Sequence, residues 1–324
     1  MSQIAKNDKH LMLFSGRAYP ELAQEVARIM ETELVPTRAL TYANSEIYVR
    51  FEESVRGCDA FVIQSHTSPV NEWIMEQLIM VDALKRASAK RITVVAPFYP
   101  YARQDKKHLG REPISARLVA DLYKAAGADR IMSVDLHASQ IQGFFDGPVD
   151  HLWGMPPLAD YVKDKYDTSE MTIVSPDAGR VRLADVWTDK LGCPLAIIHK
   201  RRDPNQANTV AVHEVVGEVK DRVCLLVDDM IDTAGTIAQA AHALREHGAK
   251  AVICAATHPV FSGPAAQRLN QSGIAEIIVT NTLPIRTPEP ITNLTVLSIA
   301  PLIAKAINAV FLDGSVTSLF GGQA

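Results

Sequence analysis

The sequence predicts an α/β protein of two halves, each a mostly parallel sheet flanked by helices. Short apolar runs alternate with segments whose apolar residues recur at helical spacing, which is typical of parallel α/β units. The chain has 324 residues, more than a usual single domain, and 47% of them are hydrophobic, enough for two cores. Clustered Gly, Pro and Asp at residues 147–157 mark a boundary between halves of similar size and rhythm.

The elements are expected to alternate from residue 11 onward. Residues 11–14 form the first predicted strand, and one face of the helix after it is marked by Leu22, Val26, Ile29 and Met30. Another helix is expected over 115–126, with Leu118, Val119 and Leu122 on one side. The further strands are predicted at 61–64, 92–96, 131–134, 173–175, 195–198, 223–227, 251–256, 277–280 and 294–298.

Composition argues for a soluble protein in the cytoplasm. The net charge of −4 gives no sign of binding to nucleic acid or to an anionic membrane. The first ten residues lack the apolar core of a signal peptide, and no apolar run is long enough to span a bilayer. The four cysteines have no paired spacing for zinc or a redox motif, which suits reduced thiols: Cys58, Cys193, Cys224 and Cys254.

Polar residues gather where several predicted strands end. In open parallel sheets, ligands bind beyond the carboxyl ends of strands. Five such clusters therefore predict one or two adjoining clefts, and we expect the sites of the two halves to meet. The clusters are Arg103 to Asp105, Asp135 with His137, Asp177, Lys200 to Arg202, and Asp228 with Asp229.

Residues 223–236 carry the most specific pattern. The apolar run 223–227 suits a strand buried on both faces, and it ends in two adjacent carboxylates, Asp228 and Asp229. A turn rich in Thr, Gly and Asp follows. A helix is predicted next, with a left-handed stop at Gly248, because apolar residues recur at helical spacing: Ile237, Ala240, Ala241 and Leu244.

This turn opens a helix, where free backbone N–H groups and the helix dipole favour an anion. Thr233 and Thr236 add hydroxyl donors. Two acids would repel a ligand that was phosphate alone, but carboxylates accept hydrogen bonds from a vicinal diol. The pattern therefore predicts a phosphorylated pentose as ligand.

Residues 228–236 resemble the phosphoribosyl-binding motif of type I phosphoribosyltransferase folds. Their exact sequence resembles that of the ribose-phosphate diphosphokinase family. The alternative, a generic strand–turn–helix crossover, requires nine positions of this character to coincide by chance. The resemblance runs from about residue 14 to 320. It implies two tandem phosphoribosyltransferase-like (Rossmann-like) domains, which we expect over residues 11–152 (nucleotide side) and 153–320 (ribose-phosphate side).

The chain has neither a Walker sequence nor a Gly-rich dinucleotide fingerprint, so ATP would be held by another route. The resemblance implies two nucleotide-binding segments, the first around residues 103–105 and the second around residues 42–46. In the second segment, Tyr42 stands where Phe is usual in the family, and Asn44-Ser45 replaces the Asp-Gly common in bacterial members. A basic loop alone is more often simply solvated. The implied ATP-binding residues are Arg103, Gln104 and Asp105 in the first segment and Tyr42, Asn44, Ser45 and Glu46 in the second.

The resemblance also implies Mg²⁺, bound through few protein ligands and many phosphate oxygens. The family's metal residues map to His137 and Asp177. A lone His after a strand is more often structural, but the family matches nearly all of residues 135–146. Asp135 is a candidate supporting partner, and Asp146 and Asp150 are weaker candidates for metal or interface roles.

The segment 199–208 is charged and contains Pro204, which predicts a mobile basic loop. A solvated surface loop is the plain alternative. In the family this is the catalytic loop, whose cations match Lys200 and Arg202. They would stabilise charge on the transferred group, and closure of a loop would exclude water.

The implied activity is transfer of the β,γ-diphosphoryl group of ATP to the 1-hydroxyl of ribose 5-phosphate. The implied assembly is homodimers forming a hexamer, with feedback through phosphate and ADP. Residues 314–320 and 50–56 resemble parts near the family's regulatory site. The rival hypotheses are a phosphoribosyltransferase and a non-catalytic regulatory relative. The implied ribose 5-phosphate residues are Arg202, Asp228, Asp229, Asp232, Thr233, Ala234, Gly235 and Thr236.

Overall fold

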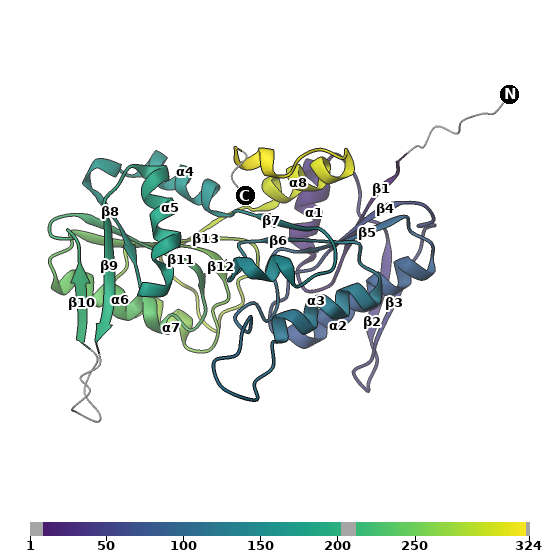
Figure 1. Cartoon of the computed structure of the whole chain (residues 1–324), viewed down its shortest axis with the longest axis horizontal. Helices are drawn as coiled ribbons and strands as arrows, with labels where there is room; N and C mark the ends of the chain where they lie inside the picture. Colours follow the sequence, from purple (N-terminus) through teal and green to yellow (C-terminus); the bar gives the residue numbers. More distant parts are fainter. Residues whose placement is uncertain (1–8, 202–211, 322–324) are drawn as a thin grey trace. The chain divides into compact units, whose positions relative to one another are not determined.

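The computed structural model describes residues 9–201 and 212–321. The chain divides into two compact units (Figure 1). Unit 1 comprises Met1–Trp153 and Ala300–Ala324 so far as they are described, and unit 2 comprises Gly154–Ile299. Residues 300–321 thus group with the first unit, although we expected the segment up to residue 320 in the second.

Unit 1 is built on a five-stranded parallel sheet of order β1-β4-β5-β6-β7. Helices α1 and α8 pack together, as do α2 and α3, and the two pairs lie on opposite sides of the sheet (Figure 1). The strands are β1 (Leu11–Ser15), β4 (Asp59–Ile63), β5 (Arg91–Ala96), β6 (Arg130–Val134) and β7 (Val149–Leu152). The helices are α1 (Pro20–Ile29), α2 (Val70–Arg86), α3 (Ser115–Ala126) and α8 (Ala300–Phe311).

The predicted inner face of α3 is wrong. Leu118 and Leu122 are exposed, and of the three expected residues only Val119 is buried. The buried stripe also includes Ala116, Ala120 and Tyr123. Within this stripe the Tyr123 hydroxyl donates a hydrogen bond to Gln77 Oε1 at 2.7 Å, a contact that the spacing of apolar residues does not reveal.

A small hairpin was not expected from the sequence. Strands β2 (Thr37–Thr41) and β3 (Ile47–Phe51) pair antiparallel and form a separate two-stranded sheet. The expected nucleotide residues 42–46 form the turn between them. Two backbone hydrogen bonds close this turn, from Tyr42 N to Glu46 O (2.8 Å) and from Ser45 N to Tyr42 O (2.9 Å).

Unit 2 holds a seven-stranded sheet of order β10-β9-β8-β11-β12-β13-β14. All neighbours are parallel except β9 and β10. The strands are β8 (Met171–Ser175), β9 (Leu195–Arg201), β10 (Val212–Val216), β11 (Val223–Ile231), β12 (Ala251–Pro259), β13 (Glu276–Thr280) and β14 (Leu294–Leu297). The helices are α4 (Met155–Lys165), α5 (Val181–Leu191), α6 (Gly235–Glu246) and α7 (Ala265–Gln271), with short 3-10 turns at Thr168–Glu170 and Ala178–Arg180. Two further 3-10 turns, at Ser139–Gly143 and Thr317–Phe320, belong to unit 1.

Both faces of this sheet are covered, as the apolar run in β11 predicts. Leu225 and Val227 belong to a core cluster with residues of α4 and α5, such as Trp187. Cys224 and Leu226 point to the other face and join a cluster with residues of α6 and α7. The alternation follows from the two-residue period of a strand.

The predicted helix after the motif is confirmed. The buried residues of α6 include all four expected apolar positions, and Gly248 has a left-handed φ of 85° just after the helix. Within the described residues, the structure contains no helix with the length and apolar character that a membrane crossing requires.

Candidate active site

The centre of the candidate site is the carboxyl end of β11. The strand pairs with β8 only as far as Leu226 opposite Val174, but with β12 it continues to Ile231 opposite Pro259. Asp228 and Asp229 were expected to follow the strand, and they lie within it instead. The strand is longer than predicted because β12 supplies a partner for its polar half.

Beyond the end of β8, a short turn faces these carboxylates. Arg180 forms ion pairs with both of them, from Nε to Oδ1 of Asp228 (3.0 Å) and from Nη2 to Oδ1 of Asp229 (2.9 Å). The sequence hypothesis did not include Arg180. A signal was present, since Arg180 follows the expected metal residue Asp177 by three positions after a strand.

The two carboxylates have little access to solvent, with exposed side-chain fractions of 15% for Asp228 and 7% for Asp229. Burial raises the pKa of Asp228 well above its ordinary value, and the neighbouring Asp229 carboxylate raises it further. The Arg180 guanidinium and the backbone N–H of Asp229 act in the opposite direction. The hydrogen bond from that N–H to Asp228 Oδ1 is 2.8 Å long.

The turn after β11 leads directly into α6. Ala234 adopts a left-handed conformation (φ 59°), which is uncommon for a residue with a side chain and is often found at functional sites. Three contacts hold the turn: Phe261 N donates to Ile231 O (2.9 Å), Ser262 N to Asp232 O (3.0 Å), and Arg268 Nη1 to Thr233 O (3.0 Å). Arg268 comes from α7, so the motif alone could not have revealed it.

The start of α6 has the features of an anion site. The first amides of a helix have no partner within the helix, and the helix dipole places partial positive charge there. Thr233 and Thr236 are exposed beside it, and Asp232 and Gly235 are half-buried. A Cβ at Gly235 would lie 3.2 Å from Arg268 Nη1, which leaves little room for a side chain.

The expected catalytic loop is only partly described. Lys200 lies in β9, opposite His213 of β10, and Arg202 lies outside the described residues, as do residues 203–208. The prediction of a loop from residue 199 is wrong for residues 199–201. They continue the strand because β10, which the sequence did not predict, pairs with them.

In unit 1, the loops after the neighbouring strands β5 and β6 carry the first nucleotide segment and the expected metal histidine. Gln104 Oε1 accepts a hydrogen bond from Ser115 Oγ (2.7 Å) at the start of α3. Asp105 is buried, and it accepts a hydrogen bond from Gln140. Arg103 is exposed. Internal contacts thus hold Gln104 and Asp105 in place.

The second nucleotide segment is the exposed turn of the β2–β3 hairpin. Tyr42 has half of its surface exposed, and its ring centroid lies 6.2 Å from that of Tyr48. Asn44 Oδ1 accepts a hydrogen bond from Glu46 N (3.2 Å), and Ser45 has a left-handed φ of 71°. One further residue supports the hairpin, since Arg17 Nη2 donates to Thr41 Oγ1 (3.0 Å).

Asp177 caps a 3-10 turn, with its Oδ1 accepting from Gly179 N at 2.8 Å. His137 follows β6, and its loop is supported by His151 Nε2, which accepts from Leu136 N (3.0 Å). The part of the chain that the structure describes contains no cluster of three or more His, Cys, Asp or Glu residues suited to a metal. The carboxylate of Asp177 is of the type that suits a Mg²⁺ ion, which takes most of its oxygen ligands from phosphates and water.

Of the weaker metal candidates, Asp150 has a different partner. Both of its oxygens lie 2.8 Å from Arg130 Nη1, and it occupies β7 rather than a strand end. Burial raises the pKa of Asp150, while Arg130 lowers it. Asp135 has a left-handed φ of 37°, and Asp146 is exposed.

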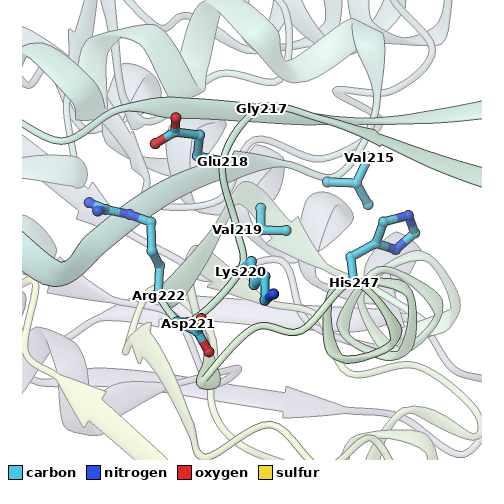
Figure 2. Close-up of a pocket in the computed structure, with 8 residues that line it drawn as sticks. All are labelled: Val215, Gly217, Glu218, Val219, Lys220, Asp221, Arg222 and His247. Carbon is cyan, nitrogen blue, oxygen red and sulfur yellow. The ribbon is translucent and has the colours of Figure 1, made fainter.

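Two hollows in unit 2 lie apart from the motif. The first, of about 510 Å³, is lined by residues that precede β11, with His247 from the end of α6 (Figure 2). At about 3.3 Å per residue, the strand places this hollow some 20 Å from Asp229. The second, of about 520 Å³, lies beside α7 and residues 288–289. Neither hollow includes a predicted site residue.

An α/β unit with two carboxylates near the carboxyl end of a strand, followed by a short turn and a helix N-terminus, defines a protein of the phosphoribosyltransferase-like class. Comparison with known proteins narrows the assignment. Residues 11–127 match the family described as the N-terminal domain of ribose phosphate pyrophosphokinase, and residues 204–321 match the phosphoribosyl synthetase-associated domain.

Curated relatives cover nearly the whole chain. The ribose-phosphate pyrophosphokinase of Streptomyces coelicolor is 66% identical over 316 residues, 98% of each chain, and that of Mycobacterium tuberculosis H37Rv is 63% identical over 319 residues. The crystal structure of phosphoribosylpyrophosphate synthetase from Mycobacterium smegmatis has a TM-score of 0.90 and 62% identity, covering 94% of this chain and 100% of its own. The chain belongs to the ribose-phosphate pyrophosphokinase family.

Proposed function

We propose that this protein transfers the β,γ-diphosphoryl group of ATP to the 1-hydroxyl of ribose 5-phosphate, giving 5-phosphoribosyl 1-diphosphate and AMP. The observation that carries this function is the pair Asp228 and Asp229 near the carboxyl end of β11, which leads through a short turn into the N-terminus of α6. Hydroxyl acceptors and an anion cradle lie next to each other there. A pentose phosphate presents the two complementary groups.

In this proposal the sugar binds in unit 2. Asp228 and Asp229 accept hydrogen bonds from the ribose hydroxyls. Residues 232–236 bind the 5-phosphate through backbone N–H groups and the hydroxyls of Thr233 and Thr236. Gly235 lets the backbone approach the phosphate closely, since it carries no side chain.

The nucleotide is proposed to bind through unit 1. Tyr42 stacks on the adenine, and Asn44, Ser45 and Glu46 provide polar contacts from the same turn. Arg103 contacts triphosphate oxygens, for which its planar guanidinium is suited. Gln104 and Asp105 are the remaining proposed ATP-binding residues.

Mg²⁺ is the proposed metal, held by His137 and Asp177 together with phosphate oxygens. When bound, it neutralises charge on the phosphates. The rest of the catalysis belongs to side chains. Asp228 and Asp229 orient the sugar so that its 1-hydroxyl faces the β-phosphorus of ATP, and that hydroxyl forms the new P–O bond as the bond to AMP breaks. Lys200 and Arg202 stabilise the negative charge that develops on the transferred group.

The proposed setting is the cytoplasm, where the product feeds nucleotide biosynthesis. Cys58, Cys193, Cys224 and Cys254 are all free and buried, which suits a reducing compartment. The proposed assembly is a hexamer formed from homodimers, with regulation by phosphate and ADP.

The test of the activity is AMP formation from ATP and Mg²⁺, with and without ribose 5-phosphate, with the sugar product followed by phosphorus NMR. We expect AMP only when the sugar is present, together with a new diphosphate at the anomeric carbon. If no AMP forms with or without added phosphate, the protein is a regulatory relative and the proposal fails.

A further inference from the structure

The ion pairs of Arg180 join it to two adjacent carboxylates, Asp228 and Asp229, that lie far from it in the sequence. Arg180 contacts one oxygen, Oδ1, of each carboxylate, through two different nitrogens at 3.0 and 2.9 Å. The planar guanidinium presents several nitrogens in a fixed arrangement, so one side chain reaches both carboxylates at once, which the point charge of a lysine does less well. The contact to Asp229 Oδ1 is an ion pair without hydrogen-bond geometry, so Arg180 acts on this carboxylate mainly through its charge and its position.

The surroundings make such a cation necessary. Adjacent carboxylates with little solvent repel each other, and burial favours the protonated form. Burial and the Asp229 charge both raise the pKa of Asp228, and among the side chains the opposing influence is Arg180. A protonated carboxyl is a donor as well as an acceptor, so it would bind a sugar hydroxyl in a different geometry.

The chain before α5 holds Arg180 in position. Asp177 O accepts hydrogen bonds from Ser175 Oγ (2.7 Å) and from Arg180 N (3.3 Å). Gly179 closes the turn, and a Cβ there would lie only 3.1 Å from Asp177 Oδ1. Because α5 packs on both β8 and β11, the end of this turn is fixed beside the two carboxylates.

We propose that Arg180 is a positioning residue for the sugar, which holds Asp228 and Asp229 close together in the arrangement that accepts the ribose hydroxyls. The guanidinium acts through the two carboxylates. This inference rests on the proposed function, because it assumes that these two residues bind the ribose.

The first test is the variant Arg180→Gln, assayed for both substrates in the full-length protein. We expect the KM for ribose 5-phosphate to rise by about tenfold or more, because a buried charge pair loses its partner. The KM for ATP should stay within about twofold. Arg182→Gln is the matched control, since Arg182 is an exposed arginine two residues further along, and it should leave both KM values unchanged.

The second test is whether Arg180 acts through the carboxylates. The variant Asp229→Asn already lacks the repulsion between the two carboxylates. Adding Arg180→Gln to this variant should therefore raise the KM for ribose 5-phosphate by a factor less than half of the factor seen when Arg180→Gln is made in the native protein. Arg180→Lys keeps the positive charge but lacks the planar guanidinium. Its KM for ribose 5-phosphate should therefore lie between that of the native protein and that of Arg180→Gln. Equal effects in both backgrounds would overturn the inference.

Two outcomes separate this inference from the proposed function. If Asp228→Asn and Asp229→Asn raise the KM for ribose 5-phosphate but Arg180→Gln does not, Arg180 is not a positioning residue and the sugar site stands. If neither aspartate variant changes that KM, the sugar site itself is wrong. Melting temperatures identify variants that fail to fold. If Arg180→Gln fails to fold, the KM for ribose 5-phosphate is compared between Arg180→Lys and the native protein instead.

Discussion

At the scale of single residues, the site depends on two adjacent carboxylates in a buried position, where charge is unfavourable. Asp229 is nearly inaccessible to solvent, and Asp228 beside it has a raised pKa. Such a pair persists only where the surroundings offset the repulsion. Arg180 provides part of that compensation, and a bound sugar that donates hydroxyl hydrogens would add to it.

The first prediction concerns Lys200, whose proposed role is to stabilise the charge on the transferred group. The variant Lys200→Ala should lower kcat by about a hundred- to a thousand-fold, as removal of one such donor typically does. Steady-state AMP formation measures this effect. Lys220→Ala is a suitable control because Lys220 is an exposed lysine in the hollow before β11. Undiminished activity of Lys200→Ala would remove Lys200 from the mechanism.

The second prediction concerns Tyr42. Half of its surface is exposed, so Tyr42→Ala should change the melting temperature little. Loss of a stacked ring should raise the KM for ATP by about tenfold, and the KM for ribose 5-phosphate should not change. Tyr42→Phe keeps the ring and should behave like the native protein. If the two variants have the same KM for ATP, the stacking assignment is wrong.

At the scale of elements, unit 2 is held together by contacts between a helix and the far strands of its sheet. Glu276, the first residue of β13, accepts hydrogen bonds from Tyr161 (2.7 Å) and Lys165 (2.8 Å) on α4, from Tyr166 just after it, and from Thr295 (2.6 Å) on β14. One carboxylate thus joins α4 to two neighbouring strands. The elements are short, so such contacts between them matter more than helix propensity.

The third prediction is a pH dependence of stability that comes from Glu276. Burial acts to raise the pKa of its carboxyl, but hydrogen bonds from Lys165, Thr295 and the two tyrosines lower it from 4.5 to about 2. A depressed folded-state pKa stabilises the protein fully above 4.5, and this stabilisation is lost as the pH falls from 4.5 toward 2.

Melting temperatures measured between pH 7 and pH 3 test this dependence. Glu276→Gln should be less stable than the native protein at pH 7, and the difference should shrink at the acid end. Glu170→Gln, a change in an exposed carboxylate paired with Lys250, serves as the comparison. A difference between Glu276→Gln and the native protein that stays constant across this range would contradict the assignment.

At the scale of the whole molecule, the chain passes from unit 1 to unit 2 and then returns. Helix α8, near the end of the sequence, packs against α1, near its beginning. Ile303 and Ile307 of α8 are fully buried. The last helix is thus part of the core of the first unit.

The fourth prediction follows from this return. Ending the chain after Ile299 removes α8, which should destabilise unit 1 by roughly 2 kcal/mol for each buried isoleucine. Hydrogen exchange should accelerate in peptides of α1 and β1, while peptides of β11 and β12 exchange as before. A chain ending at Gly314 keeps α8 and is the control. Unchanged protection of α1 would show that α8 does not stabilise unit 1.

The sequence by itself determined the features that depend on local order. The alternation of apolar runs and helical faces predicted the α/β class, and the run of residues 223–248 predicted a strand, a turn and a helix that the structure confirms. These signals are readable because the side-chain periods of helices and strands, and the chemistry of turns, act over a few residues.

Tertiary structure alone decided the features that depend on partners far away in the chain. Strand β11 extends through Asp229 because β12 pairs with it, and β9 reaches Arg201 because β10 does. Arg180 contacts Asp228, which lies 48 positions further along the chain. Arg268 contacts Thr233, which lies 35 positions before it. Residues 300–321 belong to unit 1 because α8 buries its apolar face against α1. Pairing, burial and ion pairs between distant residues leave no local pattern, since their free energy arises only when the chain has folded.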